Sequence, residues 1–219
     1  MDASFLPAAV IFDMDGLMLD TEGPAVSLWI EAAQKSGWKI DRELILGTIG
    51  IDSAGTRAAF MEKYGPDFPY ETIRQELSRS IRDRVEREGI SHRPGLLTLL
   101  DCLTARGIPL GVATSTARKT ALWKLDKGGI GDRFAVLVCG DEVSRGKPAP
   151  DIFLLAAERL GCGPSQCLGF EDSPAGLRAL HAAGIRSVFV KDLVEPSPEI
   201  LAGVWRRCND LAEAAELFR

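Results

Sequence analysis

Carboxylates, hydroxyls and a lysine fall into four short clusters that are widely spaced along this sequence. The clusters are Asp13 with Asp15, the run Thr114-Ser115-Thr116, Lys147, and Glu171 with Asp172. Each has a structural use when taken singly, because such residues also form turns, cap helices or stand solvated in loops. Four carboxylates brought close together, however, repel one another and have raised pKa values unless a cation lies among them. The clusters together therefore indicate a cation site.

The carboxylates suit a magnesium-assisted attack on phosphorus. Mg²⁺ prefers oxygen ligands and is typically held by one or two carboxylates plus a substrate phosphate, and Asp13 and Asp172 can supply those carboxylates. Asp13 can attack phosphorus and form an aspartyl-phosphate. Asp15 lies two residues further on, so on an extended segment it faces the same way as Asp13. It can protonate the departing oxygen and later take a proton from water.

The hydroxyls and the lysine suit the binding of the phosphoryl group itself. Hydroxyl and backbone N–H groups at Thr114 and Ser115, together with Lys147, can hold the charge that spreads over the phosphoryl oxygens. Phosphoryl transfer needs mainly positioning and charge neutralisation, and these residue types supply both. We therefore predict a phosphoryl-transfer site that uses Asp13 as its nucleophile.

Short apolar runs precede these clusters and are typical of strands that are buried on both faces. They cover residues 8–12, 110–113, 134–138, 167–170 and 187–190. Helical patterns lie between them, several with a proline in the first turn and a glycine just past the end. This alternation predicts an α/β fold with a doubly wound, Rossmann-like parallel sheet. Ligands bind at the carboxyl ends of such strands, so the clusters should converge there, with Asp13 and Asp172 arriving from distant ends of the sheet.

The connection between the first two strands is too long for a simple crossover. It spans almost a hundred residues, whereas a crossover typically needs a few tens. The excess carries helical patterns of its own, including the apolar stripe Ile73, Leu77, Ile81 and Val85 on a highly charged segment. We therefore predict a helical cap over residues 17–90 and an α/β core formed by residues 1–16 and 91–219.

Composition narrows the class of partner. The 219 residues carry a net charge of −5 and no Lys/Arg run, which argues against nucleic acid as the main partner. No apolar run approaches the roughly 20 residues that span a bilayer, so we expect no membrane association. The five cysteines are odd in number and scattered, as expected of reduced thiols in a cytoplasmic protein. A monomer is the default expectation.

Four segments give the sequence a family resemblance. FDMDGLMLDTE, ATST, GKPAPDIF and GFEDSPAG stand in the order and at the spacing of the haloacid dehalogenase superfamily, so the chain resembles its branch of phosphatases and β-phosphoglucomutase over nearly its whole length. The resemblance implies Asp13 as nucleophile, Asp15 as general acid and base, and Thr114 and Lys147 as phosphate binders. It implies Mg²⁺ held by Asp13, the backbone carbonyl of Asp15 and Asp172. Glu171 would bind the ion or lie just beside it, and the cap would close over a small phosphorylated metabolite.

Departures from the family patterns help to choose an activity. True dehalogenases lack the second aspartate, so Asp15 favours phosphoryl chemistry. β-Phosphoglucomutase carries a histidine that would fall at Ala25 and an arginine that would fall near Ser53, and both are absent here. We therefore expect a phosphatase acting on a sugar phosphate, a nucleotide or a similar phosphomonoester, with a phosphosugar mutase as the alternative.

A non-enzymatic alternative is a receiver domain, a signalling module that is phosphorylated on aspartate. Such a domain has a similar sheet and acidic cluster, but it has neither a general acid two residues past the nucleophile nor a cap. The substrate contacts are harder to assign. The candidates from the cap and its linkers are Glu22, Thr48, Ile49, Asp52 and Arg57, whereas Trp29 and Trp38 are expected in the core of the cap.

Overall fold

The computed structural model describes residues 5–219, in which six parallel strands form one sheet. The strand order is β3-β2-β1-β4-β5-β6. The strands are β1 (Ala9–Phe12), β2 (Leu110–Thr114), β3 (Val136–Cys139), β4 (Cys167–Glu171), β5 (Arg186–Val190) and β6 (Arg206–Cys208). The predicted α/β fold with a parallel, Rossmann-like sheet is confirmed. The edge strand β6 was not predicted, because its three residues, two of them arginines, carry no apolar run.

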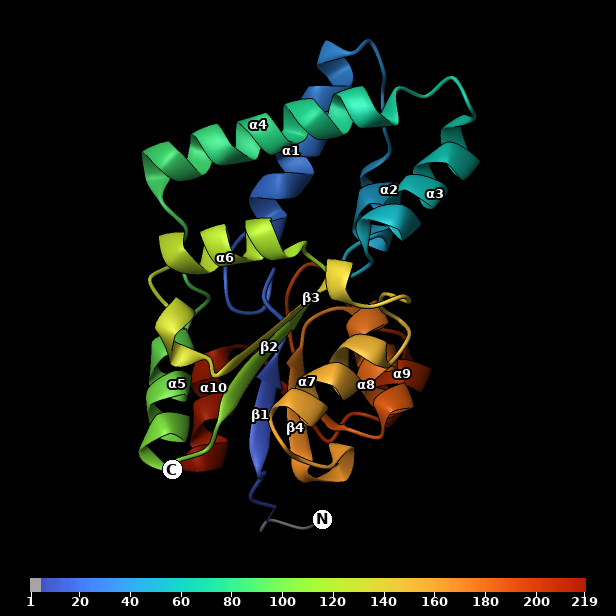
Figure 1. Cartoon of the computed structure of the whole chain (residues 1–219). Coiled ribbons are helices and arrows are strands. Elements are labelled where there is room, and N and C mark those ends of the chain that lie inside the picture. Colours follow the sequence, from blue (N-terminus) through green and yellow to red (C-terminus); the bar gives the residue numbers. More distant parts are fainter. Residues whose placement is uncertain (1–4) are drawn as a thin grey trace.

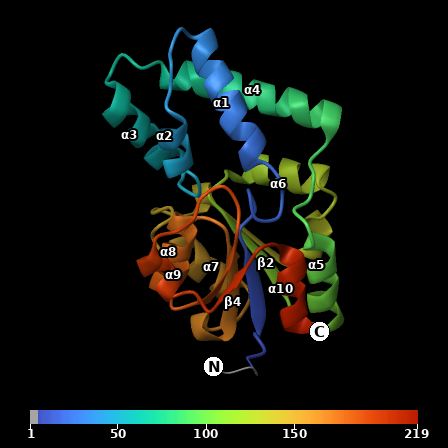
Figure 2. The same cartoon turned by 180° about the vertical axis from the view of Figure 1, so that it is seen from behind.

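Helices cover both faces of the sheet (Figures 1 and 2). Alternate residues of β1 serve the two faces, with Val10 and Phe12 packing on one side and Ala9 and Ile11 on the other. The first face is covered by α5 (Leu96–Ala105), α6 (Arg118–Lys127) and α10 (Leu211–Ala215). The second is covered by α7 (Asp151–Arg159), α8 (Pro174–Ala183) and α9 (Pro198–Ala202). Both faces of the central strands are therefore buried, as their apolar runs require.

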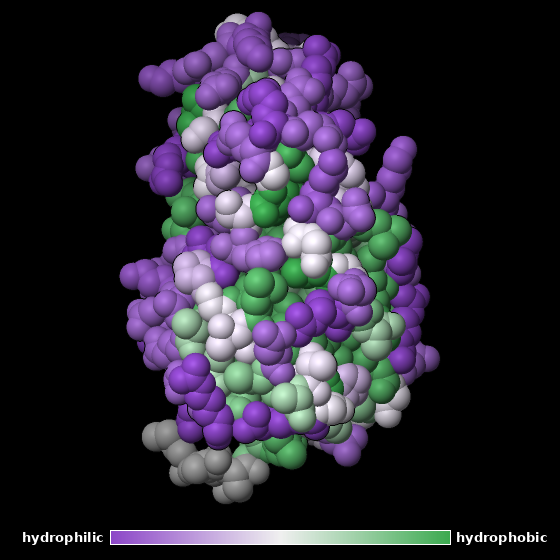
Figure 3. All heavy atoms as spheres, turned by 90° about the vertical axis from the view of Figure 1, so that its left-hand side faces the viewer, coloured by the Kyte–Doolittle hydropathy of each residue, from purple (hydrophilic) through white to green (hydrophobic). Residues whose placement is uncertain are grey.

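Four helices separate β1 from α5 and lie together at the carboxyl end of the sheet (Figures 1 and 2). They are α1 (Glu22–Lys35), α2 (Arg42–Gly47), α3 (Ser53–Tyr64) and α4 (Tyr70–Glu88). Their buried apolar residues form a separate cluster that runs from Val26 to Leu77. Trp29 stacks on Phe60 there, with ring centroids 4.9 Å apart. On the face seen in Figure 3, the surface at this end of the molecule is mainly hydrophilic.

Short 3₁₀ turns complete the described structure at Gly131–Arg133, Gly140–Glu142, Pro164–Gln166 and Glu216–Phe218. Among residues 5–219, no helix combines the length and the apolar character needed to cross a membrane.

Candidate active site

Asp13 and the acidic pair Glu171-Asp172 lie next to one another because β1 and β4 are adjacent strands. Phe12 pairs with Phe170 in the sheet, and the backbone N–H of Asp13 donates to the carbonyl oxygen of Phe170 at 3.0 Å. The expectation that the acids come from distant ends of the sheet is therefore wrong. The sheet reverses its winding direction between these two central strands, which is where open α/β sheets form their ligand sites.

Lys147 joins the two carboxylate clusters. Its Nζ donates to Asp13 Oδ1 at 2.5 Å and to Glu171 Oε1 at 2.7 Å, and it lies 4.8 Å from the ring centroid of Phe153. The lysine is 2% exposed, so this is a buried charge held by two anions and an aromatic ring. The loop lysine that the sequence places beside the site is thus within bonding distance of the predicted nucleophile.

The pKa values of the pair follow from this burial. Burial raises the pKa of Asp13 to about 7, with Glu171 and Asp15 adding to the rise and Lys147 opposing it. Burial alone would lower the pKa of Lys147, but the charges of Asp13 and Glu171 outweigh it and raise that pKa. Lys147 therefore stays protonated and keeps a positive charge beside Asp13.

Both carboxylate oxygens of Glu171 are engaged within the protein. One accepts from Lys147, and the other accepts from the backbone N–H of Ser173 at 2.7 Å. A Cβ added at Gly176, in the first turn of α8, would lie 1.7 Å from Glu171 Oε1, so glycine is what lets the helix approach so closely. These contacts favour a position for Glu171 beside a bound ion rather than on it.

Of Asp13, Asp15, Glu171 and Asp172, only Asp172 has no hydrogen-bond or ion-pair partner among the residues that the structure describes. It is 3% exposed, and its Oδ1 is buried with no hydrogen-bond partner. Burial raises its pKa well above the ordinary value, and the charges of Glu171 and Asp13 raise it further. A buried oxygen that is left unpaired costs free energy, so such a group calls for an explanation. Asp172 is therefore suited to a ligand that the protein does not itself supply.

These residues fit the magnesium site that the resemblance implies. Within residues 5–219 there is no group of three or more His, Cys, Asp or Glu side chains arranged for a metal ion. A site built from two carboxylates and the carbonyl of Asp15 is not such a group. The oxygen donors, the unpaired Asp172 and the raised pKa values of Asp13 and Asp172 all fit a hard divalent cation.

Asp15 is held by a different set of partners. Thr21 and Thr116 each donate a hydroxyl hydrogen bond to it at 2.7 Å, and Lys124 of α6 forms an ion pair with it. Burial alone would raise the pKa of Asp15, but the charge of Lys124 and these hydrogen bonds hold the pKa below its ordinary value. Sequence reasoning missed Lys124, because nothing in the local pattern sets it apart from other lysines on a helix.

The hydroxyl run after β2 has divided roles. Thr114 is buried, and its Oγ1 accepts from the backbone N–H of Thr116 at 3.1 Å. The hydroxyl of Ser115 donates to the carbonyl oxygen of Gly50 at 2.9 Å, a contact from the sheet edge to the loop between α2 and α3. Phosphate binding by Ser115, which stays a prediction, would therefore use its backbone N–H most directly.

A cleft of ≈340 Å³ lies between the sheet edge and the inserted helices. Asp13 and Thr114 line it from the sheet edge, Arg74 and Arg82 from α4, and Trp123 from α6. The cleft is within the size range of small-molecule sites, about 300–1,000 Å³.

Three of the five candidate substrate contacts, Glu22, Thr48 and Ile49, line this cleft. The other two do not. Asp52 caps α3 by accepting from the backbone N–H of Gly55 at 2.8 Å, and Arg57 forms a surface ion pair at 3.2 Å. Both side chains thus bond to other residues of the inserted helices. The expected core tryptophans are buried or packed on aromatic rings, although Trp29 also borders the cleft.

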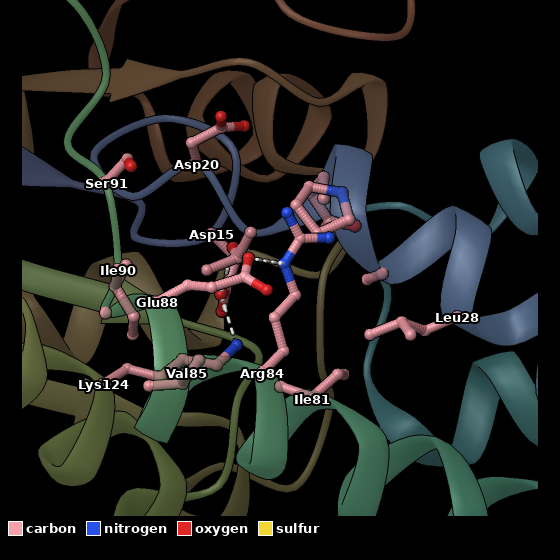
Figure 4. A pocket seen from close by; sticks show the side chains of 15 residues that line it. Asp15, Asp20, Leu28, Ile81, Arg84, Val85, Glu88, Ile90, Ser91 and Lys124 are labelled. Carbon is pink, nitrogen blue, oxygen red and sulfur yellow. Dashed lines mark hydrogen bonds and ion pairs between the residues drawn. The ribbon is translucent and has the colours of Figure 1, made fainter.

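A second cavity of ≈130 Å³ adjoins Asp15 where the two connections between the inserted helices and the sheet run (Figure 4). Figure 4 shows Lys124 reaching Asp15 from α6, while Arg84 and Glu88 of α4 pair with each other at 2.9 Å. Asp15, Glu22 and Lys124 line both cavities, so they separate one from the other.

Comparison with known proteins decides the family. A model of the family "haloacid dehalogenase-like hydrolase" matches residues 7–184, a stretch that contains all four clusters. The chain belongs to this family. The protein is 33% identical to a phosphorylated carbohydrates phosphatase of Thermotoga maritima over 83% of each chain. It is 31% identical to the fructose-1-phosphate phosphatase YqaB of Escherichia coli over 84% of this chain and 96% of that protein.

A solved structure supports the same placement. This haloacid dehalogenase-like hydrolase matches CbbY from Rhodobacter sphaeroides in complex with phosphate, with a TM-score of 0.81 and 28% identity over 95% of this chain and 96% of CbbY. Membership of a hydrolase family whose relatives include named phosphatases favours an enzyme that hydrolyses phosphomonoesters over a receiver-like signalling module.

Proposed function

We propose that the protein is a phosphatase that hydrolyses a small phosphomonoester through an aspartyl-phosphate on Asp13. The observation that carries this proposal is the adjacent placement of Asp13, bonded to Lys147, and Asp15, bonded to Lys124, at the floor of one cleft. One carboxylate thus has a cation suited to binding phosphoryl oxygens, and the other has partners that control its proton.

In the first step, a carboxylate oxygen of Asp13 attacks phosphorus, and the bond from phosphorus to the leaving oxygen breaks. Asp15 gives that oxygen a proton. In the second step, water attacks the phosphorus of the aspartyl-phosphate and Asp15 takes the water's proton. The bond from phosphorus to the Asp13 oxygen breaks, so inorganic phosphate leaves and the Asp13 carboxylate is restored. The lowered pKa of Asp15 suits the second step. Asp15 must carry a proton for the first step, and this requires its ion pair with Lys124 to be weaker at that stage than it is in this structure.

The residues in place to hold Mg²⁺ are Asp13, Asp172 and the carbonyl of Asp15. When bound there, Mg²⁺ supplies positive charge that offsets the charge of the phosphoryl oxygens. Thr114 and the backbone at Ser115 would bind the same oxygens. Lys147, anchored by Glu171, supplies a further positive charge at Asp13.

We further propose that residues 17–90 act as a mobile cap that selects the substrate. Their separate apolar core and their two connections to the sheet support this role. The acceptor is a small phosphorylated metabolite rather than nucleic acid or a membrane surface. A cytoplasmic location and a monomeric state complete the proposal, and the five free cysteines are consistent with that location.

Hydrolysis is preferred to the mutase alternative because of two positions in the cleft. Ala25 and Ser53 both line it, and neither can replace the histidine or arginine of β-phosphoglucomutase. A screen of phosphate release tests the choice, using sugar phosphates, nucleotides and short acid phosphates with and without Mg²⁺. We expect Mg²⁺-dependent turnover that Asp13→Asn abolishes while the protein stays folded. Turnover that survives this substitution or ignores a chelator contradicts the proposal. Conversion of a sugar 1-phosphate to its 6-phosphate isomer, with bisphosphate as primer, establishes the mutase instead.

A further inference from the structure

The arginines of α4 divide into two groups. Three of them pair with glutamates of the same helix: Arg79 with Glu76 at 3.6 Å, Arg84 with Glu88 at 2.9 Å, and Arg87 with Glu88 at 3.7 Å. Arg74 and Arg82, here called the cleft arginines, have no ion pair and no side-chain hydrogen bond within the described chain. They are also the two arginines of α4 that line the active-site cleft.

Aromatic rings hold both cleft arginines. The guanidinium of Arg74 lies 5.6 Å from the ring centroid of Trp29, and that of Arg82 lies 5.5 Å from the ring centroid of Trp123. A guanidinium over an indole face is attracted to it and loses some of its freedom. Eight residues separate the two arginines, which places their backbones on one side of α4 and about 12 Å apart. The part of the cleft that α4 lines thus carries two positioned positive charges.

Within the described chain, the acidic residues of the cleft form no ion pair with the cleft arginines. Asp13 is bonded to Lys147, and Asp15 is bonded to Lys124. Glu22 also lines the cleft, and it forms no ion pair with either arginine within the described chain. Outside the cleft, Glu86 lies one helical turn beyond Arg82, but its carboxylate pairs with Lys127 at 2.7 Å.

We infer that the cleft arginines bind a second phosphate group of the substrate, remote from the phosphorus that Asp13 attacks. The planar fork of N–H donors in arginine matches phosphate oxygens, and two of them present the positive charge that such a group requires. The substrate class is therefore a small metabolite that carries two phosphates, of which one is hydrolysed and the other is retained. This inference rests on the phosphatase function proposed above.

Matched substrate pairs test the inference. The enzyme is assayed with Mg²⁺ on sugars of three to six carbons that carry either one phosphate or the same phosphate plus a second. Wild-type kcat/KM should favour the bisphosphate of at least one pair by about tenfold or more, as expected for charge-assisted hydrogen bonds. Arg74→Gln and Arg82→Gln should reduce that preference, mainly by raising KM for the bisphosphate, and the double variant should nearly abolish it. Arg79→Gln, on the outer side of the same helix, should leave it in place.

The outcomes separate this inference from the proposed function. Turnover with equal kcat/KM for both members of every pair, or an equal loss for both in the cleft-arginine variants, overturns the second-phosphate site and leaves the phosphatase intact. If no sugar phosphate is turned over, the phosphatase proposal rests on the nucleotides and short acid phosphates of the screen above, and it fails if these are not hydrolysed either. Calorimetric titration of Asp13→Asn with the same pairs then decides the inference. Tighter binding of the bisphosphate that is lost in the variant that also carries Arg74→Gln and Arg82→Gln supports it, and equal binding of both members overturns it.

Discussion

Lys147 Nζ lies 2.5 Å from Asp13 Oδ1, although 134 positions separate the two residues in the sequence. The lysine reaches Asp13 from the loop after β3, and it also bonds to Glu171 at the end of β4. Three strand ends therefore meet at one buried charge cluster. Removing one member of this cluster should destabilise the folded protein, because the buried charge that remains loses its partner and is poorly solvated.

Lys147→Met should strongly destabilise the protein as well as inactivate it. The substitution leaves Asp13 and Glu171 buried beside each other without a cation, which typically costs about 3–5 kcal/mol. Urea unfolding in the presence of a chelator measures the effect. Lys35→Met, which removes an exposed lysine from its surface ion pair with Glu76, should cost only about 0–1 kcal/mol. Equal stability losses in the two variants would show that the buried cluster is not held as described.

Glu22 should make the metal-free protein less stable as the pH rises. Its pKa is about 8 in the folded protein against an ordinary value of 4.5. Between these values the folded state keeps a proton that the unfolded chain has lost, so the contribution of Glu22 to stability is present below pH 4.5 and is lost toward pH 8.

Replacing this carboxyl with an amide should remove that pH dependence. The free energy of unfolding of Glu22→Gln, relative to wild type, should therefore rise by about 1–2 kcal/mol between about pH 5 and about pH 8.5. This rise is smaller than the full pKa shift implies, because Glu22 keeps some contact with solvent. Denaturant unfolding at both pH values measures the gain. Glu31→Gln, at an exposed position on the same helix, serves as the control. A gain that does not change with pH would contradict the assignment.

Lys124→Met should raise the pKa of Asp15 and move the pH profile of the enzyme. Lys124 supplies the leading charge that holds the pKa of this carboxyl down against the effect of burial. Without it, Asp15 keeps its proton to higher pH, so the basic limb of kcat/KM, where the general acid is lost, should move upward by about one unit or more. Lys127→Met, which removes a surface pair with Glu86, should leave the limb in place. A limb that stays fixed or moves to lower pH in Lys124→Met would rule out this role.

Asp172→Asn should have opposite effects with and without magnesium. Without metal, the variant should be more stable than wild type, because it removes a buried and unpaired carboxylate that Glu171 and Asp13 repel. Mg²⁺ at about 100 times its Kd should stabilise wild type by about 2.7 kcal/mol and the variant by much less. Thermal unfolding across a Mg²⁺ titration measures both effects. Equal stabilisation of the two proteins would remove Asp172 from the site.

The convergence of the four clusters was predictable because it depends on one geometric rule. Parallel strands place their carboxyl ends at the same edge, so whatever follows each buried run must gather there. The structure shows this gathering for three of the clusters, since Lys147 bonds to both Asp13 and Glu171, and Asp172 follows Glu171 directly. Strand order is not contained in the apolar runs, and this is why β1 and β4 were not expected to be neighbours.

The residues that were missed depend on how helices dock rather than on local pattern. The apolar stripe of α4 predicts which side of that helix is buried, but not which of its five arginines face the cleft. Lys124 likewise reaches Asp15 only because α6 begins just past the hydroxyl run and lies beneath the cap. The positions of these side chains depend on how α4 and α6 pack against the rest of the protein, and a single sequence does not show that packing.

The most direct test of the mechanism is to locate the phosphoryl group on the enzyme during turnover. The protein is mixed with Mg²⁺ and a substrate found in the screen, quenched in acid and digested, and the peptide that spans β1 is fragmented in a mass spectrometer. We expect one phosphoryl group on Asp13, present only while substrate remains and absent from Asp13→Asn. Rapid turnover with no phosphoryl group on Asp13 at any time, or with the group on another residue, would contradict it.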